Sequence, residues 1–140
     1  MIVGGRVCSL GEPKEEADRQ TCIGNQNMVS IAKNCAEAGV TPVIDWIIPD
    51  DTQLDQFVTG LAPLPVWLIV LDPGDAACTE RNRHREDGFD FHDHDGLVGG
   101  MRREYGPCAW WVSSTDQTAD ETFRLILDRS HGDQGCPPGP

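Results

Sequence analysis

Arginine side chains are concentrated in one short stretch of a strongly acidic chain. The segment CTERNRHRED, residues 78–87, contains three of the nine arginines, whereas the formal net charge of the 140 residues is −12. Arg81 and Arg85 are four residues apart, so on a helix their side chains lie on one face. Two guanidinium groups on one face can hold a polyanion through charge-assisted, often bidentate bonds. A site for a polyanion is therefore one of two interpretations of this spacing.

A second pair of arginines suggests how such a site would close. Arg102 and Arg103 follow later in the chain, and either could approach the same phosphates from another helix. Arginines on a mobile lid shield a phosphoryl group in transfer from water and neutralise the charge that develops on it. The alternative is a solvated helix whose arginines pair with neighbouring carboxylates, and spacing alone does not decide between the two. Those carboxylates belong to Glu80, Glu86 and Asp87.

Two aspartates follow apolar, β-rich segments. Asp45 lies in TPVIDWII, residues 41–48, which has the composition of a short strand. Ligands of open α/β sheets bind at the carboxyl ends of the strands, where a carboxylate could hold Mg²⁺ or orient a hydroxyl. A helix cap or a structural carboxylate explains Asp45 equally well. Asp72 ends the run PVWLIVLDP in the same way, but Pro73 after it favours a cap or a turn.

Histidines and aspartates alternate in the segment FHDHD. With His84, the side chains of His92 and His94 could ligate zinc, because imidazole and carboxylate groups at alternate positions suit that metal. Clustering of polar residues in a loop, without a ligand, is the interpretation we favour. We accordingly assign no metal site, and a metal-dependent enzyme built on these three histidines remains an alternative.

Helix and strand patterns alternate along the chain, which predicts an α/β fold with a parallel sheet. The predicted strands are residues 41–48, 65–73 and 108–112, and the predicted helices are residues 13–38, 50–61, 95–105, 118–127 and one from about Asp75 onward. Residues 1–129 are expected to form one domain, and residues 130–140 a disordered tail. The predicted sheet core is Val43, Ile44, Trp46, Ile47, Val66, Leu68, Ile69, Val70, Trp111 and Val112, covered by Met28, Ile31, Phe57, Leu61, Phe123 and Leu127.

Composition excludes some classes of function. A pI near 4.5 argues against nucleic-acid binding, which needs a basic face. No apolar run is long enough to span a membrane, so no membrane partner is expected, and the cytoplasm is the predicted compartment. The six cysteines are widely spaced without a C-x-x-C pair, and we interpret them as core residues rather than as a disulfide framework.

Taken in order, several segments resemble the small P-loop kinases of the chloramphenicol phosphotransferase-like and zeta-toxin-like group. These segments, within residues 1–129, are MIVGGRV, EEADRQ…NMVSIAKNCAEAGVTPVID, PVWLIVLDP, R-x-x-x-R and WWVSSTDQTADET. The resemblance implies ATP and Mg²⁺ as cofactors and a small-molecule acceptor of unknown kind. It implies catalytic roles for Arg81 and Arg85 on the lid and for Asp45 at the end of a strand. It also implies that Ser114 and Thr115 lie beside the nucleotide, and we predict that Arg102 binds the nucleotide as well.

The resemblance does not extend to the segments with which that family begins. The phosphate-loop signature G-x-x-x-x-G-K-[ST] does not occur in the 140 residues. The predicted fold is therefore an incomplete three-layer P-loop NTPase-like sheet without its first strand, phosphate loop and second strand. Either Met1 is not the true start or the chain is a degenerate remnant. The predicted function is that of an ATP-dependent phosphotransferase, inactive or truncated as given. The alternative is a non-catalytic pseudo-kinase module, which could form a homo-oligomer that covers exposed sheet edges.

Overall fold

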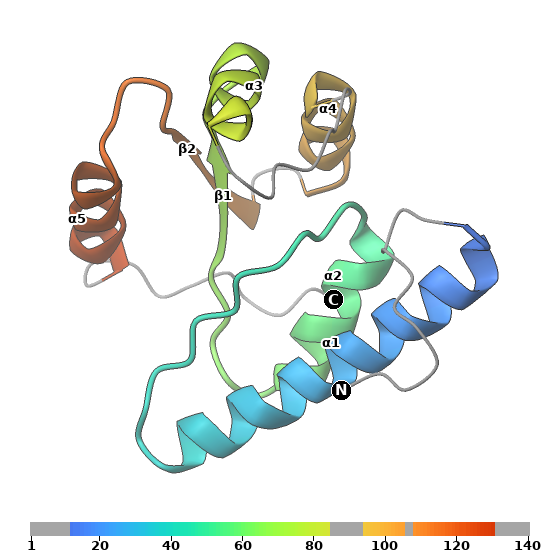
Figure 1. The fold of residues 1–140 in the computed structure, drawn as a ribbon. Coiled ribbons are helices and arrows are strands. Elements are labelled where there is room, and N and C mark those ends of the chain that lie inside the picture. Colours follow the sequence, from blue (N-terminus) through green and yellow to red (C-terminus); the bar gives the residue numbers. More distant parts are fainter. Residues whose placement is uncertain (1–11, 85–93, 106–107, 131–140) are drawn as a thin grey trace. The chain divides into compact units, whose positions relative to one another are not determined.

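The computed structural model describes residues 12–84, 94–105 and 108–130. Within them lie five helices and two strands (Figure 1). The chain divides into two compact units, Met1–Ile48 with Thr52–Pro63 and Pro49–Asp51 with Leu64–Pro140. The single domain expected over residues 1–129 stays a prediction. Of the tail expected at residues 130–140, Ser130 ends a helix and the remainder lies outside the described residues.

Helix α1 (Lys14–Glu37) is the longest element of the first unit, and its prediction from the sequence is confirmed. It ends in a hydrogen-bonded turn that requires a glycine: Gly39 has φ 78° and donates its N–H to the Ala36 carbonyl oxygen at 3.0 Å. The Val40 N–H donates to the Cys35 carbonyl oxygen at 2.9 Å. This Schellman pattern pairs carbonyl groups that would otherwise have no partner at the helix end.

The buried face of α1 differs from the predicted one. Ala17, Thr21 and Ala32 are buried, but Ile31 is 63% exposed. Asn25 is completely buried and donates from Nδ2 to Oε1 of Gln56 at 2.9 Å. A buried amide needs such a partner, because an unpaired polar group loses its hydration without compensation.

Helix α2 (Asp51–Leu61) is confirmed, and its Phe57 and Leu61 are buried. The two helices approach closely at a glycine. A Cβ atom added to Gly60 would lie 2.9 Å from Cγ1 of Val29, well inside contact distance. The hydrogen in place of a side chain at residue 60 therefore sets how near α2 can lie to α1.

The second unit is built on two parallel strands, β1 (Leu68–Asp72) and β2 (Ala109–Ser113). They pair in register from Leu68 opposite Ala109 to Asp72 opposite Ser113. β1 lies within the predicted segment 65–73, β2 extends one residue beyond the predicted segment 108–112, and their parallel direction is as predicted. Val70, Trp110 and Val112 are buried in this unit.

The prediction of a strand at residues 41–48 is wrong, and the predicted three-layer sheet is therefore wrong as well. Residues 41–49 form no regular secondary structure, and Val43 is 90% exposed, Ile47 56% and Trp46 38%. The described residues are mostly helical with a two-stranded sheet, so the predicted P-loop NTPase-like α/β fold is contradicted. A β-rich composition is not sufficient for a strand, because the backbone must also find a neighbour to bond.

Helices α3 (Asp75–Arg83), α4 (His94–Tyr105) and α5 (Ala119–Ser130) complete the second unit. All three were predicted, and α3 and α4 pack beside each other (Figure 1). Helix α5 begins with a capping box: the Thr118 N–H donates to Oε2 of Glu121 at 2.8 Å, and the Glu121 N–H donates to Oγ1 of Thr118 at 3.3 Å. The bond from the Thr118 N–H, with a second one from the Thr118 hydroxyl to the same carboxylate oxygen, lowers the pKa of Glu121, because both bonds stabilise its charged form.

Two consecutive tryptophans connect the sheet to helices on its opposite faces. Successive side chains of a strand point to opposite sides, so Trp110 and Trp111 face different helices. The guanidinium of Arg129 on α5 lies 4.5 Å from the ring centre of Trp110, and that of Arg102 on α4 lies 4.1 Å from that of Trp111. Helices α5 and α4 accordingly lie on opposite sides of the strand pair (Figure 1).

The one tyrosine of the chain provides a test of packing in the second unit. Tyr105 is 3% exposed, its hydroxyl has no hydrogen-bond partner among the described residues, and burial raises its pKa well above the usual value. Asp50 and Glu104 add to this shift. An unfolded tyrosine loses its proton near pH 10, whereas the folded one keeps it. The contribution of Tyr105 to stability should therefore be constant below about pH 10 and fall as the pH rises further.

We expect titration of tyrosinate absorbance in the folded protein to show a midpoint well above pH 10, and Tyr105→Phe to remove both this signal and the alkaline loss of stability. At pH 7 the free energy of unfolding should change little, because the substitution removes a hydroxyl that has no partner. A titration midpoint near 10 in the folded state would contradict the burial of this side chain.

Candidate functional site

The carboxyl ends of β1 and β2 meet at a network of hydrogen bonds that holds several of the predicted site residues. After β1 the chain turns at Gly74, whose φ of 81° and ψ of 157° fall in a region open almost only to glycine. Oδ1 of Asp72 accepts the Gly74 N–H at 3.2 Å. The turn predicted at Asp72 and Pro73 is thus confirmed.

The loop after β2 is bonded to this turn. The Ser114 N–H donates to the Asp72 carbonyl oxygen at 3.3 Å, which extends the strand pairing by one residue. Oγ1 of Thr115 donates to the Pro73 carbonyl oxygen at 2.7 Å. Ser114 is buried, whereas Thr115 is exposed. The two loops therefore form one connected edge.

Arg81 reaches this edge from α3. Its Nη2 donates to the Ser114 carbonyl oxygen at 2.7 Å and to the Thr115 carbonyl oxygen at 3.2 Å. Among the described residues, no carboxylate forms an ion pair with Arg81. Carbonyl oxygens orient the guanidinium group but do not cancel its charge. Arg81 therefore presents a positioned positive charge at the carboxyl edge of the sheet.

The alternative interpretation, an arginine paired with a neighbouring carboxylate in solvent, applies to Arg83 and not to Arg81. Nη1 of Arg83 donates to Oε2 of Glu80 at 2.7 Å, and Nε2 of His84 lies 3.0 Å from Oε1 of the same carboxylate. All three side chains are largely exposed. Glu80 is thus bonded to Arg83 and His84 and not to Arg81.

Arg102 reaches the same edge from α4. Its Nη2 donates to Oδ2 of Asp72 at 2.7 Å, and the two side chains are 51% and 19% exposed. The plane of Trp111 lies under the guanidinium group. Asp72 neutralises this arginine, so its charge at the edge is weaker than that of Arg81.

The structure brings Arg81, Arg102, Ser114 and Thr115 together at one edge. Arg85 lies outside the described residues. Asp45 is exposed in the first unit, and the strand that was to end beside it is not formed. The assigned roles of all these residues remain predictions.

Sequence reasoning did not find the partners of Arg102. Asp72 is thirty residues before it, and Trp111 is on a different element, so no local spacing connects them. The only signal in the sequence was the place of Asp72 at the end of an apolar run.

Cys78 is the cysteine of α3, near Arg81 and Asp72 of this edge. Burial raises the pKa of its thiol, and the positive charge of Arg81 opposes that shift only in part. A thiol of raised pKa has little of the reactive thiolate at neutral pH. We therefore assign Cys78 no chemical role.

The zinc alternative is not tested, because His92 and Asp93 lie outside the described residues. His84 is bonded to Glu80, and His94 begins α4. In the part of the chain that is described, no three potential metal ligands come together.

No protein family, curated protein or solved structure that we compared with this chain matches it. The resemblance to small P-loop kinases therefore stays a prediction from the sequence. Within the described ranges, no helix combines the length and apolar character needed to cross a membrane.

The backbone at Gly74 provides a test of the turn that shapes this edge. We expect Gly74→Ala to lower the free energy of unfolding by about 1–3 kcal/mol, because a Cβ atom strains this conformation even though nothing lies near it. Gly24 is the matched control: it lies in the interior of α1 with open space around it. Gly24→Ala should raise stability by about 0.5–1 kcal/mol. Equal effects of the two substitutions in urea unfolding would contradict the assigned turn.

Proposed function

We propose that the second unit binds the phosphate groups of a nucleotide at the carboxyl edge of β1 and β2, as an ATP-dependent phosphotransferase does. The observation that supports this proposal is the guanidinium group of Arg81, which is fixed at that edge by two carbonyl oxygens and carries no ion pair among the described residues. A guanidinium group has five N–H donors. Those not bonded to Ser114 and Thr115 are available to phosphate oxygens.

Arg102 is the second cation of the proposed site. Trp111 holds the plane of its guanidinium group, and Asp72 occupies one of its donors. Phosphate oxygens would compete with Asp72 for this arginine while the stacking on Trp111 is kept. The roles that the resemblance implies for Arg85 and Asp45 stay predictions, because Arg85 lies outside the described residues and Asp45 belongs to the other unit.

ATP with Mg²⁺ is the proposed ligand. The magnesium ion would arrive with the polyphosphate, since Mg²⁺ is commonly bound through substrate phosphates and only one or two carboxylates. The acceptor is a small molecule whose identity the described residues do not indicate.

We propose that the 140-residue chain binds nucleotide but does not transfer a phosphoryl group. They contain no G-x-x-x-x-G-K-[ST], the loop whose backbone amides and lysine hold the β- and γ-phosphates in P-loop kinases. Such a chain can bind nucleotide through its arginines and still not orient a phosphoryl group for attack. In this respect the proposal coincides with the alternative of a non-catalytic pseudo-kinase module.

The proposed compartment is the cytoplasm, where nucleotides are abundant. The four cysteines of the described residues are free thiols, which is usual in a reducing compartment.

Two arginines of α3 allow a matched test of binding. We expect titration calorimetry with MgATP to show binding, and Arg81→Ala to weaken it at least about tenfold, as loss of a charge-assisted bond of about 1.5–3 kcal/mol implies. Arg83→Ala removes the same charge from the same helix, but Arg83 is paired with Glu80. This control should bind nearly as the wild type does. Equal weakening by both variants, or no binding by the wild type, would exclude Arg81 as a phosphate ligand.

Turnover provides the second test. We expect no ATP hydrolysis or phosphoryl transfer by the 140-residue chain above the uncatalysed rate, because the loop that positions the γ-phosphate is not among its residues. Steady-state release of phosphate measures this directly. Rates typical of kinases, about 1–100 s⁻¹, would show that this chain performs the transfer by other means.

A further inference from the structure

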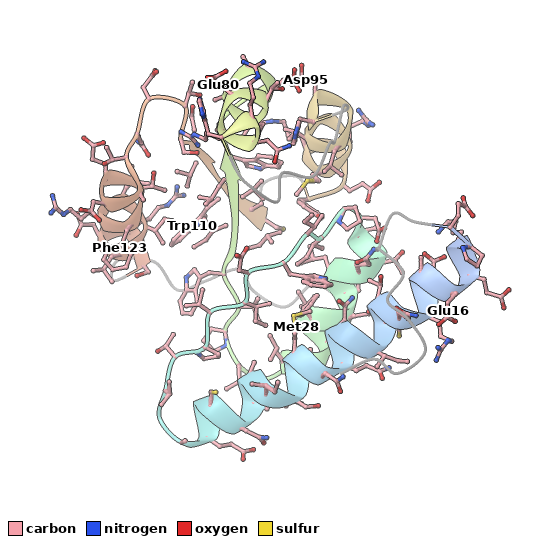
Figure 2. All side chains as sticks on the ribbon, viewed as in Figure 1. Glu16, Met28, Glu80, Asp95, Trp110 and Phe123 are labelled. Carbon is pink, nitrogen blue, oxygen red and sulfur yellow. The ribbon has the colours of Figure 1, made fainter. Side chains whose placement is uncertain are left out.

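Two arginines at the carboxyl edge of β1 and β2 differ in the charge of the groups that hold them. Arg81 donates to two backbone carbonyl oxygens, which carry no net charge. Arg102 donates to the carboxylate of Asp72 at 2.7 Å. Glu80 on α3 and Asp95 on α4 mark the two helices from which these arginines come (Figure 2). The edge therefore has one arginine without an ion pair among the described residues and one whose charge a carboxylate balances.

The carboxylate of Asp72 is held in this position from its other side. Its Oδ1 atom accepts the Gly74 N–H at 3.2 Å, so one oxygen belongs to the turn after β1 and the other to the ion pair with Arg102. The Asp72 side chain is 19% exposed, whereas that of Arg102 is 51% exposed. An anion that arrives from solvent therefore meets an accessible arginine that already has a carboxylate beside it.

The ring of Trp111 orients the guanidinium group of Arg102 without cancelling its charge. The group lies 4.1 Å from the ring centre, and a cation over an aromatic face is attracted to it while it stays a cation. Asp72 acts differently, because its negative charge balances that of the arginine and repels an approaching anion. The two partners of Arg102 therefore have opposite consequences for an anionic ligand.

We propose that Asp72 is an internal counter-ion that restrains phosphate binding at this edge. A phosphate group that binds Arg102 must displace the carboxylate or share the guanidinium group with it. In both cases the loss or weakening of the ion pair lowers the affinity for the phosphate. This inference rests on the proposed function and adds a regulating residue to it. If Asp72 instead positioned Arg102 for the ligand, removal of its charge would weaken binding, so the sign of the effect separates the two roles.

Asp72→Asn removes the ion pair and keeps the turn. The asparagine oxygen can still accept the Gly74 N–H, whereas its NH₂ group cannot accept a bond from Arg102. We expect inorganic tripolyphosphate, titrated calorimetrically into the full chain, to bind this variant about fivefold more tightly than the wild type, as the loss of an ion pair of about 1 kcal/mol implies. Asp72→Ser, whose hydroxyl can also accept the Gly74 N–H, should show the same gain. A gain in affinity cannot result from unfolding.

Two controls separate the ion pair from a general effect of charge. Asp75 is three residues from Asp72, is exposed and forms no ion pair among the described residues. Asp75→Asn makes the same change of charge and should alter the affinity less than about twofold, because an exposed charge is screened. Arg102→Gln removes the other partner of the pair. In that background Asp72→Asn should have no more effect than Asp75→Asn, because no ion pair is left to break.

The outcomes distinguish this inference from the proposed function. If the wild type binds tripolyphosphate and Asp72→Asn leaves the affinity unchanged or lowers it, the counter-ion role is overturned and the phosphate site stands. An equal gain in the Arg102→Gln background would overturn that role as well. Binding by Asp72→Asn but not by the wild type would support the counter-ion role and exclude the wild-type edge as a phosphate site. If neither protein binds, both proposals fail.

Discussion

The parallel pairing of β1 with β2 is the constraint on which the second unit depends. A parallel pair is less stable per residue than an antiparallel one, and two strands alone rarely persist in water. Helices must therefore cover both faces, and each does so with an arginine over a tryptophan, Arg129 on Trp110 and Arg102 on Trp111. The register that places Asp72 opposite Ser113 also brings the turn after β1 to the loop after β2. The candidate site is a consequence of that register.

Helix α3 shows how geometry assigns different roles to similar residues. Arg81 and Arg83 are two positions apart, which is about 200° around a helix, so their side chains leave on nearly opposite sides. One reaches the backbone carbonyls beyond β2, and the other pairs with Glu80 in solvent. The two residues have the same side chain and carry the same charge. Only the direction in which each side chain leaves the helix separates a candidate ligand from a surface ion pair.

Local signals in the sequence predicted the helices, but contacts between residues far apart in the sequence could not be predicted. Gly39 marks the end of α1, and Thr118 with Glu121 marks the start of α5, because these caps act within a few residues. The segment 41–48 has the composition of a strand, yet a strand exists only where a neighbour accepts its hydrogen bonds. The hydrogen bond of the buried Asn25 to Gln56 is equally non-local, because the two residues are thirty-one positions apart. In the candidate site, the arginines could be found by spacing, but Asp72 and Trp111 could not.

The acidity of the chain determines how an anion can be held at this edge. With a net charge of −12, the protein repels anions at long range. At physiological ionic strength, however, charges more than about 8 Å apart are largely screened. Contacts made directly at the edge therefore decide binding. Arg81 has no ion pair among the described residues, while Arg102 offers a free charge only if a ligand displaces Asp72. A ligand with several phosphate groups can engage both arginines and offset the loss of that ion pair. A single phosphate has less to gain, so the edge is better suited to polyphosphates.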